Sequence, residues 1–178
     1  MSHAPADRTA AADAVDSITE DWRRERPELD TAPLQVLARL HRTFVRYQGL
    51  LTASLDQFGL SVAGFDVLTS LRRAGSPYRL TAGQLAASGL ISSAGVTLRL
   101  DRLEKEGLIV RERDDQDRRI VYSRLTDRGL ALIDKVFDAH LDNERVMLAG
   151  LSPDERRMLA GLLGRLEHSL IAAEQQRG

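Results

Sequence analysis

The stretch LDRLEKEGLIVRERDDQDRRIVYSRLTDRG, residues 100–129, decides the fold of this chain. Its first residues have the apolar spacing of a helix, which Gly107 ends. Two segments of strand character follow, joined by the polar run 114–118, and Thr126 can then cap a new helix. The stretch therefore predicts a helix, a β-hairpin with a charged tip and a second helix. The two strand segments are residues 108–113 and 119–125.

Two short helices are predicted before this hairpin. Thr81 can cap the first, Gly89 interrupts it, and the second runs from about Ser92 to Glu106. Two helices joined by a tight turn and followed by a hairpin form a winged helix-turn-helix, whose second helix has the size to enter the major groove of DNA. We assign residues 61–125 to this winged domain.

Longer amphipathic helices are predicted on both sides of the winged domain, in residues 31–60 and 126–178. Their apolar residues recur at three- and four-residue steps, as in the series from Leu37 to Phe58. Such spacing is typical of a dimer seam and also of an ordinary core, so the pattern leaves both open. The predicted fold is mainly α with a small β-hairpin wing, a winged helix-turn-helix with a helical dimerisation layer. Residues 1–30 form an N-terminal extension with a charged helix over 6–26.

Composition excludes several classes of protein. The chain has 178 residues and contains no cysteine, which excludes disulfide scaffolds, thiolate metal sites and thiol redox sensing. With 29% charged residues it has no apolar run near the ~18 residues that a membrane-spanning helix needs. The first residues lack the apolar core of a signal peptide. We therefore expect a cytoplasmic protein.

The formal net charge of -1 would by itself argue against a nucleic-acid partner. The charge is unevenly distributed, however. Residues 72–128 hold twelve basic and eight acidic side chains, a net +4, whereas residues 1–30 carry a net -4. The basic excess coincides with the predicted winged domain, which favours double-stranded DNA as a partner.

Small hydroxyl side chains lie at the start of the predicted recognition helix. Ser92, Ser93 and Thr97 are placed where base edges or phosphates are reached. Hydroxyl groups at a helix N-terminus are also common as caps, so both readings stay open.

Two arginines, Arg118 and Arg119, lie beside the hairpin tip, and Asp117 is placed to brace one of them. A guanidinium is attracted into a narrow minor groove, where negative potential is concentrated. A lone charged turn is usually only solvated, but its position after a helix-turn-helix favours DNA contact.

The quoted stretch strongly resembles the MarR family of bacterial transcription regulators, through the end of the recognition helix, the wing residues Asp117 to Arg119, and the exit through Leu125, Thr126 and Gly129. The similarity extends over about residues 31–173. It implies a homodimer with interlocked terminal helices, whose two winged domains bind a pseudo-palindromic operator with half-sites roughly 10 bp apart. It also favours repression.

Asp66 is the odd residue of an apolar helix, and Arg99 is a candidate partner for its carboxylate. A fold-stabilising ion pair is one reading. The extension with Trp22, together with Asp66, Arg99 and Arg111, resembles the urate-responsive subgroup of the MarR family, and this resemblance implies a ligand site. Trp22 would pack on a flat ligand, and Arg99 would connect the site to the recognition helix. Citrate, aconitate and aromatic or antibiotic ligands are alternatives.

Other functional classes find little support in the sequence. The four histidines are scattered, without a nearby nucleophile or metal-ligand spacing, and no phosphate-binding glycine loop is present. We expect neither an enzyme nor a bound cofactor or metal. A helical dimerisation or adaptor protein that does not bind DNA remains an alternative, because fold does not fix function.

Overall fold

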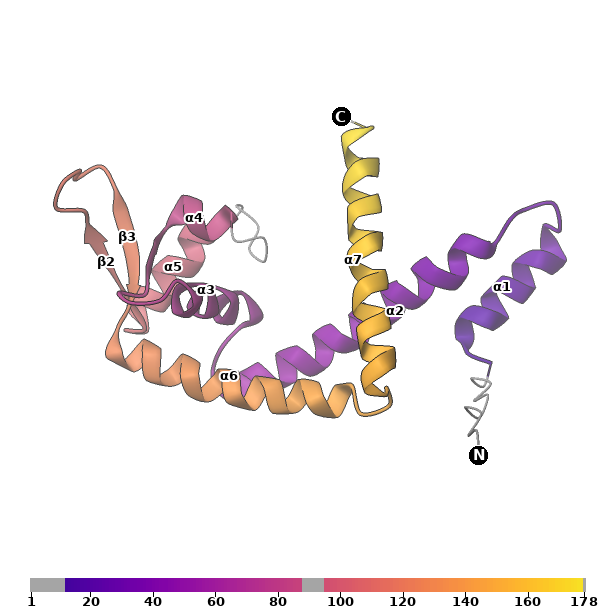
Figure 1. Ribbon diagram of the computed structural model, residues 1–178, viewed down its shortest axis with the longest axis horizontal. Coiled ribbons are helices and arrows are strands. Elements are labelled where there is room, and N and C mark those ends of the chain that lie inside the picture. Colours follow the sequence, from indigo (N-terminus) through magenta and orange to yellow (C-terminus); the bar gives the residue numbers. More distant parts are fainter. Residues whose placement is uncertain (1–11, 88–94, 178) are drawn as a thin grey trace. The chain divides into compact units, whose positions relative to one another are not determined.

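The computed structural model describes residues 12–87 and 95–177 (Figure 1). The chain divides into two compact units, Met1–Ala53 and Ser54–Gly178, each described by itself below. In chain order the elements are α1 (Ala14–Glu25), α2 (Ala32–Asp56), α3 (Val62–Arg73), β1 (Arg79–Thr81), α4 (Ala82–Ala87), α5 (Val96–Lys105), β2 (Ile109–Arg113), β3 (Val121–Leu125), α6 (Asp127–Met147) and α7 (Pro153–Gln175).

The first unit joins α1 to the beginning of α2. Asp13 forms a capping box with Asp16, so α1 begins at Ala14, later than the predicted residue 6; residues 6–11 lie outside the described part. Arg39 of α2 donates to both carboxylates, with Nε at 2.9 Å from Asp13 and Nη2 at 2.7 Å from Asp16. The fully buried Thr19 accepts a hydrogen bond from the Gln35 amide at 3.0 Å. The extension is therefore a helix fixed to α2 by charged and polar contacts.

The core of the second unit forms where α3 packs on α5 and α6. Ser61 caps α3 as the sequence predicts, and its Oγ accepts from the Gly64 N–H at 3.1 Å. The side chains at the centre of this core are almost completely buried: Val67, Leu68, Leu71, Leu85, Leu100, Ile133 and Val136. This packing holds the short helices α4 and α5 against a rigid support.

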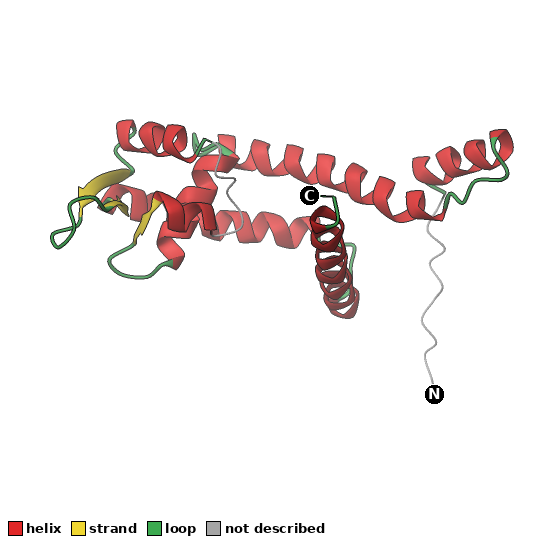
Figure 2. Cartoon of the chain, turned by 90° about the horizontal axis from the view of Figure 1, so that it is seen from above, coloured by secondary structure: helices red, strands yellow, loops and turns green. Residues whose placement is uncertain are grey.

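The sheet has three antiparallel strands in the order β1, β3, β2 (Figure 2, strands in yellow). The predicted hairpin is present, with Ile109 opposite Leu125 and Arg113 opposite Val121. β1 is an addition to the predicted fold. Its three residues pair with β3 and lead directly into α4, so the sheet ties the helix-turn-helix to the wing.

The exit from the wing is closely packed. Thr126 caps α6, accepting from the Gly129 N–H at 3.0 Å, and its hydroxyl donates to the Gly107 carbonyl at 2.8 Å. Gly129 lies so close to the wing that a Cβ atom there would stand 2.0 Å from the Leu108 carbonyl oxygen. One short segment therefore joins the end of α5, the sheet and the start of α6.

The terminal helix α7 begins with a capping box between Ser152 and Glu155, as the sequence predicts. Among the described residues, those of α7 are all at least partly exposed. Large apolar side chains instead remain exposed on α7 and on α2, among them Val36, Leu37, Phe44, Val45, Met158, Leu162, Leu163 and Ile171. These exposed side chains belong to no core among the described residues, whereas Leu51 and Leu55 near the end of α2 are buried.

Candidate nucleic-acid interface

The recognition helix α5 presents one apolar and one open face. Val96, Leu100 and Leu103 are buried, whereas Thr97 is exposed in the first turn. The helix begins at Val96, later than the predicted Ser92, because Gly95 has a positive φ of 86° that a helix does not accommodate. Ser92 and Ser93 lie outside the described residues, so their roles stay predictions.

The wing tip is ordered by carboxylates. Asp114 accepts hydrogen bonds from the N–H groups of Gln116 and Asp117, at 2.9 and 3.0 Å. Asp117 in turn binds the Arg119 guanidinium through both oxygens, at 3.0 Å from Nε and 2.9 Å from Nη2. These contacts form the brace that the sequence suggested, and the side-chain hydrogen bond from Arg119 lowers the pKa of the Asp117 carboxyl.

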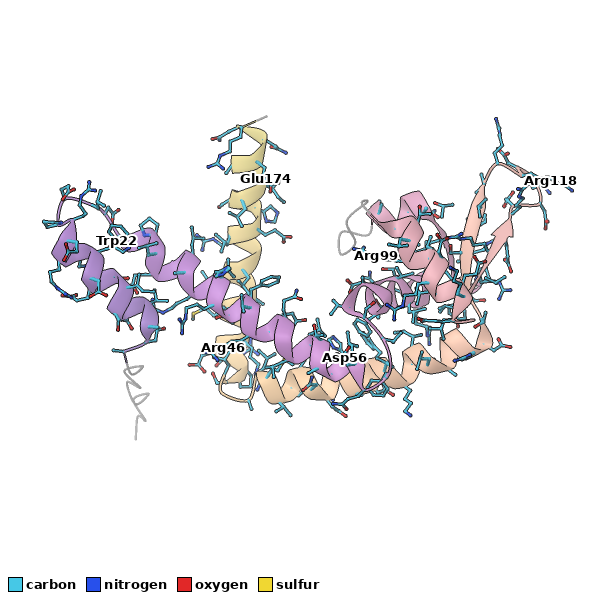
Figure 3. The ribbon with its side chains drawn as sticks, turned by 180° about the vertical axis from the view of Figure 1, so that it is seen from behind. Trp22, Arg46, Asp56, Arg99, Arg118 and Glu174 are labelled. Carbon is cyan, nitrogen blue, oxygen red and sulfur yellow. The ribbon has the colours of Figure 1, made fainter. Side chains whose placement is uncertain are left out.

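Both tip arginines are available to a partner. The Arg119 side chain is 91% exposed although Asp117 holds one edge of its guanidinium. Figure 3 shows Arg118 at the outer end of the hairpin, and it is also exposed. The wing therefore offers two cations, one with a fixed orientation.

A second set of charges lies across the sheet and was not anticipated. The Arg124 Nε and Nη2 atoms are both 2.6 Å from Glu112 Oε1, and Arg79 stacks on the Tyr122 ring at 4.3 Å. The hydrogen bond from Arg124 lowers the pKa of Glu112. The residue pattern along one β-strand does not predict these contacts, because each pair joins two different strands of the sheet.

The positive charge of Arg99 on α5 acts on the Asp66 carboxyl of α3, and the pairing of the two side chains stays a prediction. Asp66 is half-buried, and this burial raises the pKa of its carboxyl above the ordinary value. The positive charge of Arg99 is the largest opposing influence, followed by Arg73 and His140. The carboxylate is thus held in an unfavourable environment that nearby cations only partly compensate.

A cavity of about 310 Å³ opens between the start of α3 and α5. Arg99 and Arg102 contribute its positive charge, and Glu106 accepts from Arg102 Nε at 2.9 Å. The remaining lining is mostly apolar or small: Gly59, Leu60, Ser61, Gly64, Leu98 and Leu103. The cavity thus combines Arg99, the paired Arg102 and Glu106, and an otherwise apolar or small lining.

The structure places the other two predicted ligand residues in different surroundings. Trp22 belongs to the first unit, is 46% exposed and lines a shallow groove with Ile18, Asp21 and Glu25. Arg111 binds α5 itself, with Nη2 at 2.6 Å from Asp101 Oδ1 and Nη1 at 3.6 Å from Glu104 Oε2. Arg99 thus acts electrostatically on Asp66, whereas Arg111 contacts Thr97, Asp101 and Glu104 of α5.

Among residues 12–87 and 95–177, no cluster of three or more histidine, aspartate or glutamate side chains could hold a metal ion. No helix in the same ranges is both long and apolar enough to cross a membrane.

The chain is similar to known transcription regulators. A model of the MarR family matches residues 60–121. The HTH-type transcriptional regulator PecS of Dickeya dadantii is 40% identical over 157 residues, which cover 88% of this chain and 95% of PecS. Because the matched proteins are transcription regulators, the prediction that the chain is not an enzyme is confirmed.

Solved structures support the same assignment of fold. BpsR of Bordetella bronchiseptica, whose DNA binding is regulated by 6-hydroxynicotinic acid, is 26% identical with a TM-score of 0.69, over 78% of this chain and 97% of BpsR. A variant of MarR from E. coli in complex with operator DNA is 26% identical with a TM-score of 0.65, over 82% and 96% of the two chains. The predicted winged, mainly helical fold is confirmed.

Proposed function

Because the chain belongs to the MarR family of transcription regulators, we propose that it is a homodimeric repressor that leaves a pseudo-palindromic operator when it binds a small anionic metabolite such as urate. In this proposal residues 61–125 bind DNA, residues 31–60 and 126–178 form the dimer, and residues 1–30 are an accessory helix. Such a repressor acts in the cytoplasm, where its operator is.

The observation that carries the DNA-binding role is the braced arginine of the wing. Asp117 holds the Arg119 guanidinium while leaving its side chain 91% exposed, which suits entry into a minor groove. Thr97 is exposed on α5, where it can meet the major groove together with Ser92 and Ser93. Arg118 adds a second cation for the phosphates. The relative MarR is known in complex with operator DNA.

The exposed apolar stripes of α2 and α7 support the homodimer. Monomeric proteins rarely leave large contiguous apolar surfaces in water. A second copy of the chain presents the same stripes, so a two-fold axis can bury both sets at once. In this proposal the same axis would place the two recognition helices in successive major grooves.

The effector role is supported by the strained environment of Asp66. A ligand anion near Arg99 would compete with Asp66 for the same cation, and Arg99 lies on α5, so the competition would act on the recognition helix. Trp22 and Arg111 are also proposed to contact the ligand, Trp22 with a flat surface and Arg111 with a further positive charge. A coupling of about 1–3 kcal/mol would lower operator affinity about 5–150-fold, provided that the ligand prefers the DNA-free state.

DNA binding is tested with the promoter region of the chain's own gene and a shuffled duplex of equal length. The wild-type protein should bind the promoter more tightly, with affinity that falls steeply with salt. Arg119→Ala should weaken binding to both duplexes and flatten the salt dependence, whereas Arg23→Ala on α1, whose side chain is 59% exposed, serves as the charge-matched control. Equal affinity of the wild type for both duplexes would favour an adaptor role instead.

The effector is tested separately by adding urate, xanthine, citrate, aconitate and 6-hydroxynicotinic acid to the promoter complex. Trp22 is the only tryptophan, so its fluorescence reports binding directly. Asp66→Asn and Arg99→Gln should each reduce the response of the complex to an active compound. Intact DNA binding without a response to any compound would remove the effector assignment and leave the DNA-binding role in place.

A further inference from the structure

Arg111 of β2 makes a set of contacts that all end on the recognition helix. Its guanidinium lies 2.6 Å from Asp101 Oδ1 and 3.6 Å from Glu104 Oε2, and Nη2 donates to the Thr97 carbonyl at 3.4 Å. The Arg111 backbone N–H also donates to Glu104 Oε1 at 3.1 Å. One residue of the wing therefore contacts α5 along more than a helical turn.

These contacts hold one side of α5. Thr97, Asp101 and Glu104 follow one another at steps of four and three residues, so they share a face of the helix. The core grips a different face through Val96 and Leu100, which are 4% and 3% exposed. A helix held on two faces cannot rotate about its axis without breaking one of these sets of contacts.

The charges at this position need compensation. Asp101 and Glu104 place two carboxylates on the helix that is proposed to enter the major groove, and their side chains are 41% and 37% exposed. DNA phosphates would repel these carboxylates. Arg111 neutralises part of that charge while its own side chain is only 30% exposed, which directs the guanidinium toward α5.

We propose that Arg111 is a positioning residue for operator recognition, which fixes the rotation of α5 relative to the wing through Asp101 and Glu104. This inference rests on the proposed DNA binding. It requires no contact between Arg111 and DNA, and it applies to the effector-free protein. Because rotation of α5 moves the groups that face the bases, the loss of Arg111 should affect recognition of sequence more than attraction to phosphate.

The test uses full-length protein without effector and two duplexes of equal length, one recovered from a random pool by the wild-type protein and one shuffled. Arg111→Gln should weaken binding to the selected duplex about tenfold, as expected for loss of a charge-assisted contact set. Binding to the shuffled duplex should change by less than about twofold. Arg113→Gln, on the same strand and exposed, is the matched control for loss of one positive charge.

A second experiment, in a variant without the two carboxylates, shows whether Asp101 and Glu104 transmit the effect of Arg111 on DNA binding. In a chain that already carries Asp101→Asn and Glu104→Gln, Arg111→Gln should have less than about twofold further effect on the selected duplex. Amide hydrogen exchange within α5 should accelerate in Arg111→Gln while exchange in α6 stays unchanged, which separates a local release of α5 from general unfolding.

Four results would overturn the proposal. Equal losses on both duplexes with a smaller salt slope would make Arg111 a phosphate contact. A tenfold loss that persists in the carboxylate-free background would show that Arg111 acts on DNA directly. An equal loss in Arg113→Gln would reduce the effect to wing charge, and unchanged binding by Arg111→Gln would remove any role. Failure of the wild-type protein to prefer its selected duplex would instead contradict the proposed DNA-binding function.

Discussion

Replacing Gly129 by alanine is expected to strain the junction between the wing and α6. The added Cβ would lie 2.0 Å from the Leu108 carbonyl oxygen and 2.9 Å from its carbon. Ordinary contact begins near 3.4 Å, so the two backbones must separate by more than 1 Å. The Leu108 oxygen also accepts from the Thr126 N–H at 3.1 Å and from its hydroxyl at 3.2 Å, and this separation would lengthen both bonds.

The magnitude follows from these contacts. Overpacking against backbone costs about 1–3 kcal/mol, and each weakened hydrogen bond about 1 kcal/mol more. We therefore expect Gly129→Ala to lower the free energy of unfolding by about 3–5 kcal/mol, which for a chain of this length lowers Tm by roughly 6–20 °C.

Thermal unfolding followed by circular dichroism measures this change, with the protein concentration held constant because a dimer's stability depends on it. Gly83→Ala is the matched control, because the nearest atom to a Cβ in that α4 position is 3.9 Å away. The control should be neutral or more stable by up to about 1 kcal/mol. If Gly129→Ala melts within about 1 °C of the wild type, the close approach does not constrain the junction.

Three further predictions concern charged groups. Asp66→Asn should raise stability against urea at pH 7, because burial raises the pKa of Asp66 and its ionisation opposes folding; the gain should shrink as the pH falls toward the ordinary value of 3.8. Arg39→Gln should accelerate amide exchange in α1. The hydrogen bond from the Asp13 N–H and the pairing with Arg39 lower the pKa of Asp16, so the stabilisation that ionised Asp16 provides is lost as the pH falls. The wild type should therefore show the same acceleration below about pH 4. Asp117→Asn should weaken operator binding about two- to tenfold without changing the salt slope, since Arg119 keeps its charge but loses its brace.

Each of these three predictions would be contradicted by a specific result. A stability gain for Asp66→Asn that is independent of pH would mean that desolvation of the charge is not its cause. Exchange in α1 that is unaffected by Arg39→Gln would show that the contacts other than those of Arg39, among them the hydrogen bond from Gln35 to Thr19, suffice to hold the extension. A reduced salt slope in Asp117→Asn would show that Arg119 no longer reaches the DNA at all.

The parts of the fold that the sequence predicted are those with local causes. Ser61, Thr126 and Ser152 all cap helices in the structure, and Gly107, with a φ of 69°, follows the end of α5. Capping depends on residues within one helical turn, and a left-handed glycine acts at a single position, so a linear pattern contains the information.

The missed features depend on residues far apart in the chain. β1 has only three residues, too few for an alternating pattern, and its pairing partners lie more than forty positions later in β3. Gly95 shows another limit of prediction from sequence. Because its φ is positive, α5 begins at Val96 and not at the predicted Ser92. The sequence does not indicate which of several glycines adopts that conformation.

The candidate site was predictable in part. The apolar pattern of its helix singled out Asp66, with Arg99 as a candidate partner, and the positive charge of Arg99 acts on that carboxyl. The brace at Arg119 followed from adjacent residues. The partners of Arg111 could not be predicted from adjacent residues, because exposed acidic residues such as Asp101 and Glu104 are ordinary on a helix. Only the packing of β2 on α5 shows that these two carboxylates bind Arg111.

The bond between Asp117 and Arg119 also affects when conformational entropy is lost. A free arginine at a wing tip samples many rotamers, and ordering it during association costs about 0.5–1.5 kcal/mol. Because Asp117 already binds Nε and Nη2, most of that ordering takes place when the hairpin folds. In the proposed complex Arg119 would therefore enter the groove already ordered. A protein of nearly zero net charge could in this way gain DNA affinity by losing less conformational entropy on binding, whereas a basic protein gains it from a larger positive charge.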